Sequence, residues 1–328
     1  MQFDSRANGW ILGEHDMDAL INVAVPVFGI VACGYLAGYF GILAGDSAAA
    51  LNRFVYYFAL PPVLFVFTAR APIGEVLNWP FLGAYLGGSV LTLLVSVAAG
   101  VLYFRHSLEL LTLQSLTAVF ANTAYMGVPL FLAALGPQGV LPAIISTLAT
   151  TTLFIGGAIA ILETVRAPGP AASQISKDVA GTLGRNPLLI APFLGIAFSY
   201  FSIPIPKAIG NFLDLMAAAA GPGALFALGL SLVGRKLLGD MPEVIWLVVL
   251  KLLVHPAMTF LLVTFVFAMD EAWSQAAVIL SALPVGALVF VIAQQYDVFV
   301  QRASSTIVIS TAFSVATISL LLVYFRIG

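Results

Sequence analysis

The stretch Asn122-Thr-Ala-Tyr-Met-Gly-Val-Pro129 lies in the middle of an apolar segment that covers residues 110–136. Pro129 has no N–H group and its ring clashes with the preceding helical turn, and Gly127 weakens the same turn. The side chains of Asn122 and Thr123 need hydrogen-bond partners that lipid cannot supply. We therefore expect a broken helix, which is tolerated at membrane depth only where protein or a water-filled cavity covers the freed backbone groups.

A second apolar segment, residues 272–296, carries a similar interruption in Ser281-Ala-Leu-Pro284-Val-Gly286. Two interrupted hydrophobic helices in corresponding positions of two halves are a sequence sign of a transporter's substrate site. An unwound segment also exposes helix N-terminal N–H groups, which favour an anion. Asn122 and Thr123 either line this polar site or serve as hydrogen-bonding contacts between helices.

The composition predicts an all-α integral membrane protein. Of the 328 residues 61% are hydrophobic and 9% are charged, and the mean hydropathy is +1.06. A soluble domain has about 25% charged residues, so these charges could not cover a soluble surface. The net charge of −2 gives no reason to expect a nucleic-acid partner. The sequence has no Walker loop, zinc-protease helix or nucleophile elbow, so we expect no enzymatic activity, no cofactor and no metal.

Ten apolar segments are long enough to be candidate spans, which need roughly 20 residues. They cover residues 19–41, 47–69, 80–104, 110–136, 139–165, 187–202, 206–233, 242–268, 272–296 and 303–326. The polar connection 167–186 separates a first five-helix unit, 19–166, from a second, 187–328, and residues 1–18 form a short lead-in. Because five is an odd number, the second unit would enter the membrane from the opposite side. That arrangement is an inverted repeat with antiparallel broken helices.

Weak internal similarity supports the repeat. Pro62-Val-Leu-Phe65 resembles Pro222-Gly-Ala-Leu-Phe226 at an offset of 160 residues, and Pro129 and Pro284 are 155 residues apart. Coincidence among apolar helices that each contain a proline is the alternative explanation.

The positive charges favour one orientation, because cytoplasmic loops carry an excess of Lys and Arg. With the N-terminus outside, eight basic residues fall inside and four fall outside. The inside set is Arg53, Arg105, Arg166, Lys177, Arg185, Arg235, Lys236 and Arg302; the outside set is Arg6, Arg70, Lys207 and Arg326. We expect both termini outside the cytoplasm and the linker inside it.

Lys251 and His255 lie four residues apart in the eighth segment, so they share one helix face. An ionisable group inside a membrane is costly and is by default a functional hypothesis. Lys251 either holds carbonyls freed at the helix breaks, meets an anionic substrate or takes the place of a coupling cation. His255 reads first as a hydrogen-bonded packing residue.

Four motifs together resemble the auxin efflux carrier family, which includes plant PIN-formed carriers and bacterial malonate-type permeases. They are Asn52-x-Phe54-x-Tyr56-x-x-x-x-Pro61-Pro-Val-Leu-Phe65, Asn122-Thr-x-x-Met126-Gly-Val-Pro129-Leu, Lys251-x-x-x-His255-Pro256 and Leu283-Pro284-x-Gly286-x-x-x-Phe290-Val-x-Ala293-x-x-Tyr296. The last is the most specific, and the similarity covers nearly the whole chain from Leu20 to Phe325.

This resemblance implies ten helices in two inverted repeats, as in bile-acid symporters and NhaA-like proteins. Helices 1, 2, 6 and 7 would form a scaffold, and helices 3–5 and 8–10 a transport bundle. Helices 4 and 9 would cross at Pro129 and Pro284, with an organic anion bound beside the crossing. The implied mechanism is elevator-type alternating access, and the implied assembly is a homodimer. The resemblance makes Asn122 the polar substrate-side residue of helix 4. Our full hypothesis for the substrate contacts is Asn122, Thr123, Met126, Pro129, Pro284, Val285 and Gly286, supported by Lys251 and His255.

The chain also departs from the family pattern. Similar plant sequences carry Lys-Glu before the tyrosine of helix 9, where this chain has Gln294-Gln295, and Ala124 stands where glycine is common. The long hydrophilic loop of many plant carriers is replaced by about twenty residues. The first two departures leave the substrate open, and the short loop argues against loop-based regulation.

The leading hypothesis is a secondary carrier for a small organic anion, a mono- or dicarboxylate, in the plasma (bacterial inner) membrane. The runner-up is a sodium- or proton-coupled organic-anion symporter of the bile-acid type. A channel or a membrane receptor is the alternative from another class, and a membrane-embedded hydrolase is a remote one.

Overall fold

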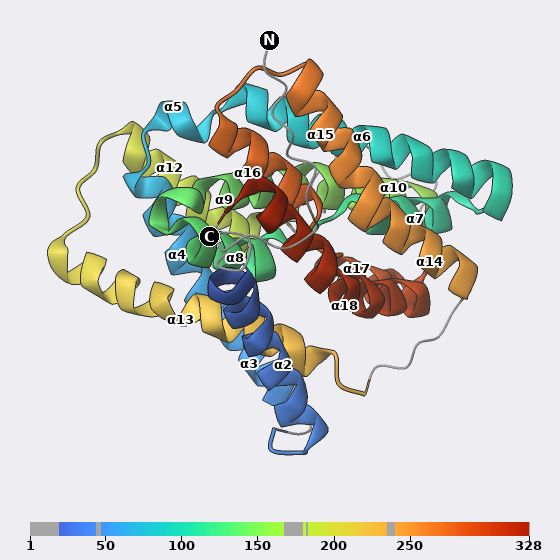
Figure 1. Cartoon of the computed structure of the whole chain (residues 1–328), viewed down its shortest axis with the longest axis horizontal. Helices are drawn as coiled ribbons and strands as arrows, with labels where there is room; N and C mark the ends of the chain where they lie inside the picture. The colour runs from blue at the N-terminus through green and yellow to red at the C-terminus, as the bar shows by residue number, and fades with distance from the viewer. Residues whose placement is uncertain (1–19, 44–46, 167–179, 182, 235–239, 328) are drawn as a thin grey trace, which may run out of the picture.

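The computed structural model describes residues 20–43, 47–166, 180–181, 183–234 and 240–327, and these residues are mainly helical (Figure 1). The lead-in 1–18 and most of the linker 167–186 lie outside the described residues. Seven helical segments are long and apolar enough to cross a membrane. Together with one short helix and two interrupted ones, they account for the ten expected segments.

The helices run in the following order along the chain. The first segment is η1 (Leu20–Ala24) and α2 (Val25–Tyr39); the second is α3 (Ser47–Phe54), η2 (Val55–Ala59) and α4 (Leu60–Arg70); α5 (Ile73–Val76) leads to the third, α6 (Trp79–Ala99) and η3 (Gly100–Phe104). The fourth is α7 (Leu108–Val119), η4 (Thr123–Gly127) and α8 (Val128–Leu135), and after η5 (Pro137–Gly139) the fifth is α9 (Leu141–Thr150), η6 (Thr151–Ile155) and α10 (Gly156–Arg166). The sixth and seventh are α12 (Pro187–Tyr200) and α13 (Lys207–Ser231), and the eighth is α14 (Met241–Val249), η7 (Leu250–Val254) and α15 (His255–Phe265). The ninth is α16 (Glu271–Ser281) and α17 (Leu288–Tyr296), and the tenth is α18 (Val300–Phe325).

Two close helix pairs form one side of the molecule, at the left and bottom of Figure 1. Helix α2 packs along α13, and α4 packs along α12. Glycines let these backbones approach: a Cβ atom on Gly229 would lie 1.9 Å from the carbonyl oxygen of Val31, and one on Gly195 would lie 1.9 Å from Thr68 Oγ1. Small residues at such contacts are typical of tightly associated membrane helices.

The remaining long helices gather on the other side of the molecule (Figure 1). Helix α6 packs along α15, where a Cβ atom on Gly88 would lie 2.2 Å from Thr259 Oγ1. Helix α14 packs against α18, and α7 packs against both α6 and α10. One apolar core runs across both sides and includes Leu64, Met126 and Leu280, so the interrupted helices lie within the protein core.

A polar cluster joins the ends of three segments on this second side. The fully buried carboxylate of Glu243, at the start of α14, lies 2.7 Å from His106 Nε2 through its Oε1 atom. Its Oε2 atom lies 3.0 Å from Arg302 Nε at the start of α18, close enough for an ion pair but not aligned for a hydrogen bond. The guanidinium of Arg302 also lies over the ring of Phe299.

A second polar cluster holds the end of α17. Arg166, the last residue of α10, pairs with Glu109 at 3.0 Å and donates a hydrogen bond to the carbonyl oxygen of Tyr296. The hydroxyl of Tyr296 donates to Glu163 at 2.5 Å. Because α7, α10 and α17 meet here through charged groups, the cluster fixes the ends of segments four, five and nine relative to one another.

Candidate functional site

The fourth segment is broken where its polar residues begin. Helix α7 ends at Val119, Phe120 is extended with φ −77° and ψ 103°, and the chain becomes helical again at Thr123. The expected break at Gly127 and Pro129 is therefore wrong in position. Pro129 lies in the first turn of α8, directly after the π-helical turn η4. Because η4 continues directly into α8, Pro129 lies inside one helix, Thr123–Leu135, and the π-helical turn precedes it where its ring and its missing N–H group disturb α-helical bonding.

The ninth segment is broken at its proline, as the sequence predicts. Helix α16 ends at Ser281, residues 282–287 are not helical, and α17 begins at Leu288. Pro284 lies inside this gap, so Pro129 and Pro284 do not occupy equivalent places in their segments. The 155-residue offset between them does not mark structurally matching positions.

The two gaps pair with each other through their backbones. Ala121 and Val285 form an antiparallel bridge, flanked by hydrogen bonds from Asn122 N to Pro284 O and from Gly286 N to Phe120 O, both 2.9 Å long. The N–H group of Val285 donates to Ser310 Oγ on α18 at 3.2 Å. Buried backbone groups must be paired, and the crossing pairs three of the N–H groups that the interruptions release. These three N–H groups are therefore not available for an anion, which narrows the expectation that the unwound segments expose N–H groups to one.

Glycine makes this close approach possible. A Cβ atom on Gly286 would lie 2.8 Å from the ring of Phe120 and 3.1 Å from the carbonyl oxygen of Ala121. One on Gly127 would lie 3.0 Å from Leu283 Cδ1 and 3.2 Å from Leu280 Cδ2. The neighbours of Gly127 are the ends of flexible side chains, whereas those of Gly286 include backbone, so Gly286 tolerates a side chain less well.

We expect Gly286→Ala to loosen the crossing, because the added methyl group forces Phe120 and the paired backbone apart. Overpacking of this kind costs about 1–3 kcal/mol, so the melting temperature of the purified protein should fall measurably. Gly157→Ala is the matched control, since a Cβ atom there meets nothing within 4 Å. Equal melting temperatures for both variants would mean that the glycine is not needed for the crossing.

The polar residues of the fourth segment are buried beside the bridge. Asn122 and Thr123 are 4% and 2% exposed, and the amide nitrogen Nδ2 of Asn122 has no hydrogen-bond partner. Thr123 Oγ1 forms a 2.7 Å hydrogen bond with Thr147 Oγ1 on α9. A buried amide without a partner is costly, so Asn122 presents an unused donor where the two segments cross. Thr147 was not singled out from the sequence, and its only signal is a hydroxyl within an apolar helix.

The other predicted contact residues surround the same place with apolar surface. Met126 and Val285 are fully buried, and the ring of Pro129 lies 3.9 Å from the position that a Cβ atom on Gly221 would take. Helix η4 begins at Thr123, whose N–H group donates to the carbonyl oxygen of Ala121; the next two N–H groups, on Ala124 and Tyr125, have no partner within the helix. The structure thus brings both predicted motifs together and leaves a short helix start beside Asn122.

Lys251 and His255 lie in a buried hydrogen-bonded chain behind the crossing. Lys251 Nζ donates to the carbonyl oxygen of Ser281 at 2.5 Å and lies 3.0 Å from His255 Nδ1. His255 Nε2 lies 3.0 Å from Ser89 Oγ on α6, and Ser89 in turn donates to the carbonyl oxygen of Tyr85. Both Lys251 and His255 are completely buried.

This arrangement places a lysine at the C-terminal end of a half-helix. Ser281 is the last residue of α16, where the helix dipole is negative and favours a cation. Of the alternatives for Lys251, holding a carbonyl freed at a break is confirmed as a contact. Nearby, Tyr85 Oη and Ser146 Oγ are buried without a hydrogen-bond partner among the described residues, and no sequence signal singles out either of them.

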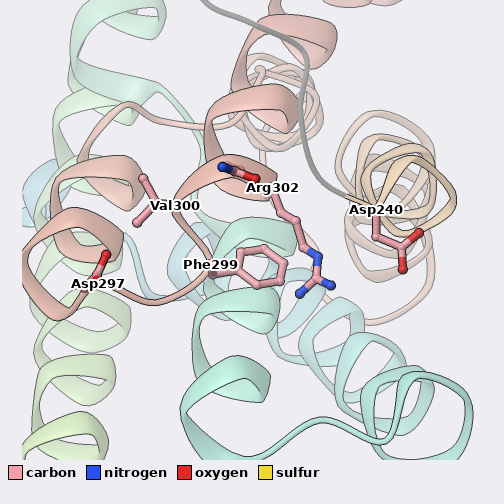
Figure 2. A pocket seen from close by; sticks show the side chains of 6 residues that line it. Asp240, Asp297, Phe299, Val300 and Arg302 are labelled. Atoms are coloured by element: carbon pink, nitrogen blue, oxygen red, sulfur yellow. The ribbon is translucent and has the colours of Figure 1, made fainter.

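A separate pocket lies at the helix ends and not at the crossing. Figure 2 shows this cavity of about 330 Å³, with the side chain of Arg302 between Phe299 and Asp240. Its other lining residues are Asp297, Val300 and Gln301. It contains none of the predicted substrate contacts and adjoins the polar cluster of Glu243.

Comparison with known proteins agrees with this architecture. A family described as "Membrane transport protein" matches residues 19–322. A protein of Rhizobium meliloti named "Putative malonate transporter" is 31% identical over 95% of this chain and 98% of its own length. The "Lysosomal cholesterol signaling protein" of Mus musculus is 30% identical over 90% of this chain but only 36% of its own length. "Auxin efflux carrier component 5" of Arabidopsis thaliana is 23% identical over 89% of this chain and 93% of its own length.

The matched region, residues 19–322, includes both interrupted segments that form the backbone bridge and both polar clusters. The extent of the family match and the identity to the Rhizobium relative confirm the resemblance drawn from the four motifs. The chain is an integral membrane protein that belongs to the membrane transport protein family, the family of the auxin efflux carriers.

Proposed function

We propose that the protein is a secondary carrier that moves a small organic anion with a carboxylate group across the membrane by an elevator-type mechanism. The observation that carries the proposal is the buried crossing, which leaves the Asn122 amide without a partner. The name of the Rhizobium relative, a malonate transporter, supports a carboxylate as the substrate class.

The anion would bind on the η4 side of the crossing. The amide of Asn122 and the hydroxyl of Thr123 would donate hydrogen bonds to the carboxylate, assisted by the first N–H groups of η4. A helix N-terminus favours an anion because of its free N–H groups and its dipole. Met126, Pro129, Pro284, Val285 and Gly286 would form the apolar surroundings, and Lys251 would add positive charge from behind α16.

The moving part in this proposal is the bundle of helices 3–5 and 8–10, and the fixed part is helices 1, 2, 6 and 7. The contact between them supports sliding, since it is largely apolar: Pro129 faces Gly221 of α13. One polar contact there is a 3.3 Å hydrogen bond from Tyr125 Oη to the carbonyl oxygen of Asn52. The two end clusters, by contrast, join helices within the proposed bundle.

The packing pairs are those expected of two inverted five-helix repeats. In such a repeat helix 1 corresponds to 6 and helix 2 to 7, so contact of helix 1 with 7 must be matched by contact of helix 2 with 6. The corresponding pairs here are α2 with α13 and α4 with α12. In the same arrangement, the contacts of α6 with α15 and of α7 with α17 would join corresponding helices of the two repeats.

The proposal includes location and assembly. The protein would lie in the plasma (bacterial inner) membrane with both termini outside, which puts Arg166 and Arg302 on the cytoplasmic side. It would form a homodimer through the scaffold, whose outer surface exposes large apolar side chains such as Phe212 and Leu215. Chemical cross-linking in native membranes would test the dimer.

Counterflow in liposomes tests the carrier against the channel or receptor. Purified protein in liposomes loaded with unlabelled malonate should take up external radiolabelled malonate transiently above equilibrium, and uptake should saturate. A carrier shows this stimulation from the opposite side because each turnover returns a loaded site, whereas a channel does not. Flux that rises linearly with concentration and is indifferent to the internal substrate would contradict the proposal.

A further inference from the structure

Lys251 is a fully buried ionisable group, and no carboxylate of the described residues pairs with it. Its Nζ atom is fully enclosed, and among the described residues its partners are the carbonyl oxygen of Ser281 and Nδ1 of His255. An isolated charge in a low-dielectric interior is strongly disfavoured unless it is paired. The carbonyl at the end of α16 compensates only in part, because it carries a partial charge.

The charged groups on the surrounding helices lie far from Lys251. Helix α6 contributes Tyr85 and Ser89, and α16 contributes the Ser281 carbonyl, with Glu271 at its distant first turn. The first turns of α7, α14 and α18 carry Glu109, Glu243 and Arg302. Glu243, on the same segment as Lys251, is about 12 Å away along the helix axis at 1.5 Å per residue, and it is occupied by His106 and Arg302.

The hydrogen bonds of Lys251 fit both of its protonation states. An ammonium group has three N–H donors, and two acceptors lie within hydrogen-bonding distance, Ser281 O and His255 Nδ1. A neutral amine retains two N–H donors and can still bond to both. In either state His255 stays neutral with its hydrogen on Nε2, from which it donates to Ser89 Oγ. Loss of one proton therefore breaks none of these contacts.

We propose that Lys251 carries an exchangeable proton that crosses the membrane together with the substrate anion, so that the carrier is a proton–anion symporter. This inference rests on the proposed function. A bound carboxylate at the crossing favours the ammonium form, and by reciprocity the ammonium form favours the anion. When the anion leaves, the proton leaves too and the amine remains.

Charge balance makes these two states the ones that move. A bundle holding an ammonium group and a monoanion is neutral in its interior, and so is an empty bundle holding the amine. A bundle that holds only the proton, or only the anion, would carry an unbalanced charge through the apolar interface, which is costly. The mechanism therefore predicts electroneutral transport of a monoanion. A dianion would leave one negative charge uncompensated in the bundle, so its transport should be slower than that of the monoanion and should carry one net negative charge.

The test uses the full-length protein in liposomes with two probes of similar shape, malonate as the dianion and monomethyl malonate as the monoanion. Counterflow is measured first at equal pH on both sides. Accumulation is then measured with an acidic exterior, with the membrane potential clamped by potassium and valinomycin. For the monoester we expect accumulation of up to about tenfold per pH unit, acidification of the lumen during uptake and no electrical current. Malonate transport should produce a current.

The outcomes separate this inference from the proposed function. Counterflow without accumulation by the pH gradient and without lumenal acidification would overturn the proton coupling and leave the carrier intact. Absence of counterflow for both probes would overturn the carrier and the coupling with it. Lys251→Arg adds a second criterion, since a guanidinium stays protonated in proteins: pH-driven accumulation should be lost relative to counterflow. If the ratio of pH-driven accumulation to counterflow in Lys251→Arg equals that of the wild type, another group carries the proton.

Discussion

A disulfide between positions 129 and 221 is expected to stop transport completely and reversibly. In the structure the ring of Pro129 on α8 lies 3.9 Å from the position of a Cβ atom on Gly221 of α13. Disulfide-bonded cysteines have Cβ atoms about 3.5–4.5 Å apart, so Pro129→Cys with Gly221→Cys should form the bond on oxidation. Because the bond would tie the proposed bundle to the proposed scaffold, uptake in liposomes should fall to background and return with a reducing agent.

Two controls accompany this experiment. The exposed native Cys33 is first replaced by serine, so that no other thiol can react. A second pair, Gly223→Cys with Val55→Cys, joins two scaffold elements, since a Cβ atom on Gly223 would lie 3.2 Å from Val55 Cγ2. Oxidation of that pair should leave transport intact. Full transport by an oxidised 129–221 protein, with the bond verified by mass spectrometry, would contradict sliding between the two parts.

Asn122→Leu is expected to reduce transport strongly without destabilising the protein. The change nearly conserves volume and removes a buried amide nitrogen that has no partner. An unsatisfied buried donor costs about 1–3 kcal/mol, so the melting temperature should stay equal or rise. Hydrogen bonds to charged groups are worth about 1.5–3 kcal/mol, so counterflow should fall by roughly 10- to 150-fold.

Stability and flux are measured separately, so that a structural role of Asn122 can be told apart from a role in transport. Asn211→Leu is the matched control, because Asn211 lies on the exposed surface of α13 beside Arg70, away from the crossing. It should transport at the wild-type rate. A marked drop in the melting temperature of Asn122→Leu would assign the amide a structural role, and unchanged counterflow would remove it from the substrate site.

Much of the fold follows from hydropathy alone. The ten apolar segments coincide with the described helices because the lipid environment demands long runs with satisfied backbone groups. The position of the first break does not follow from proline. Pro129 reads as a helix breaker in the sequence, but the helix Thr123–Leu135 continues through it, with the π-helical turn η4 directly before the proline. The interruption begins upstream at Phe120, which has no unusual local propensity. Its carbonyl oxygen accepts a hydrogen bond from Gly286 N–H beside the bridge between Ala121 and Val285, and this pairing holds it extended.

The candidate site was predictable where a polar residue interrupts an apolar run. Asn122, Thr123, Lys251 and His255 stand out for that reason, and all are buried near the crossing. Their partners were not predictable, because they depend on how distant helices meet. Ser89, Thr147 and Ser310 are ordinary hydroxyl residues of membrane helices, where such side chains often bond to their own backbone. Only the folded chain places them against His255, Thr123 and Val285.

The bridge between Ala121 and Val285 is held by main-chain atoms, so its formation does not depend on which side chains flank it. Mutation can therefore change the chemistry at positions 122, 123 and 126 while the crossing itself survives, provided that position 286 stays small. Specificity can diverge during evolution without a new architecture. The names of the relatives, which refer to malonate, cholesterol and auxin, fit a framework that has been adapted to chemically different molecules.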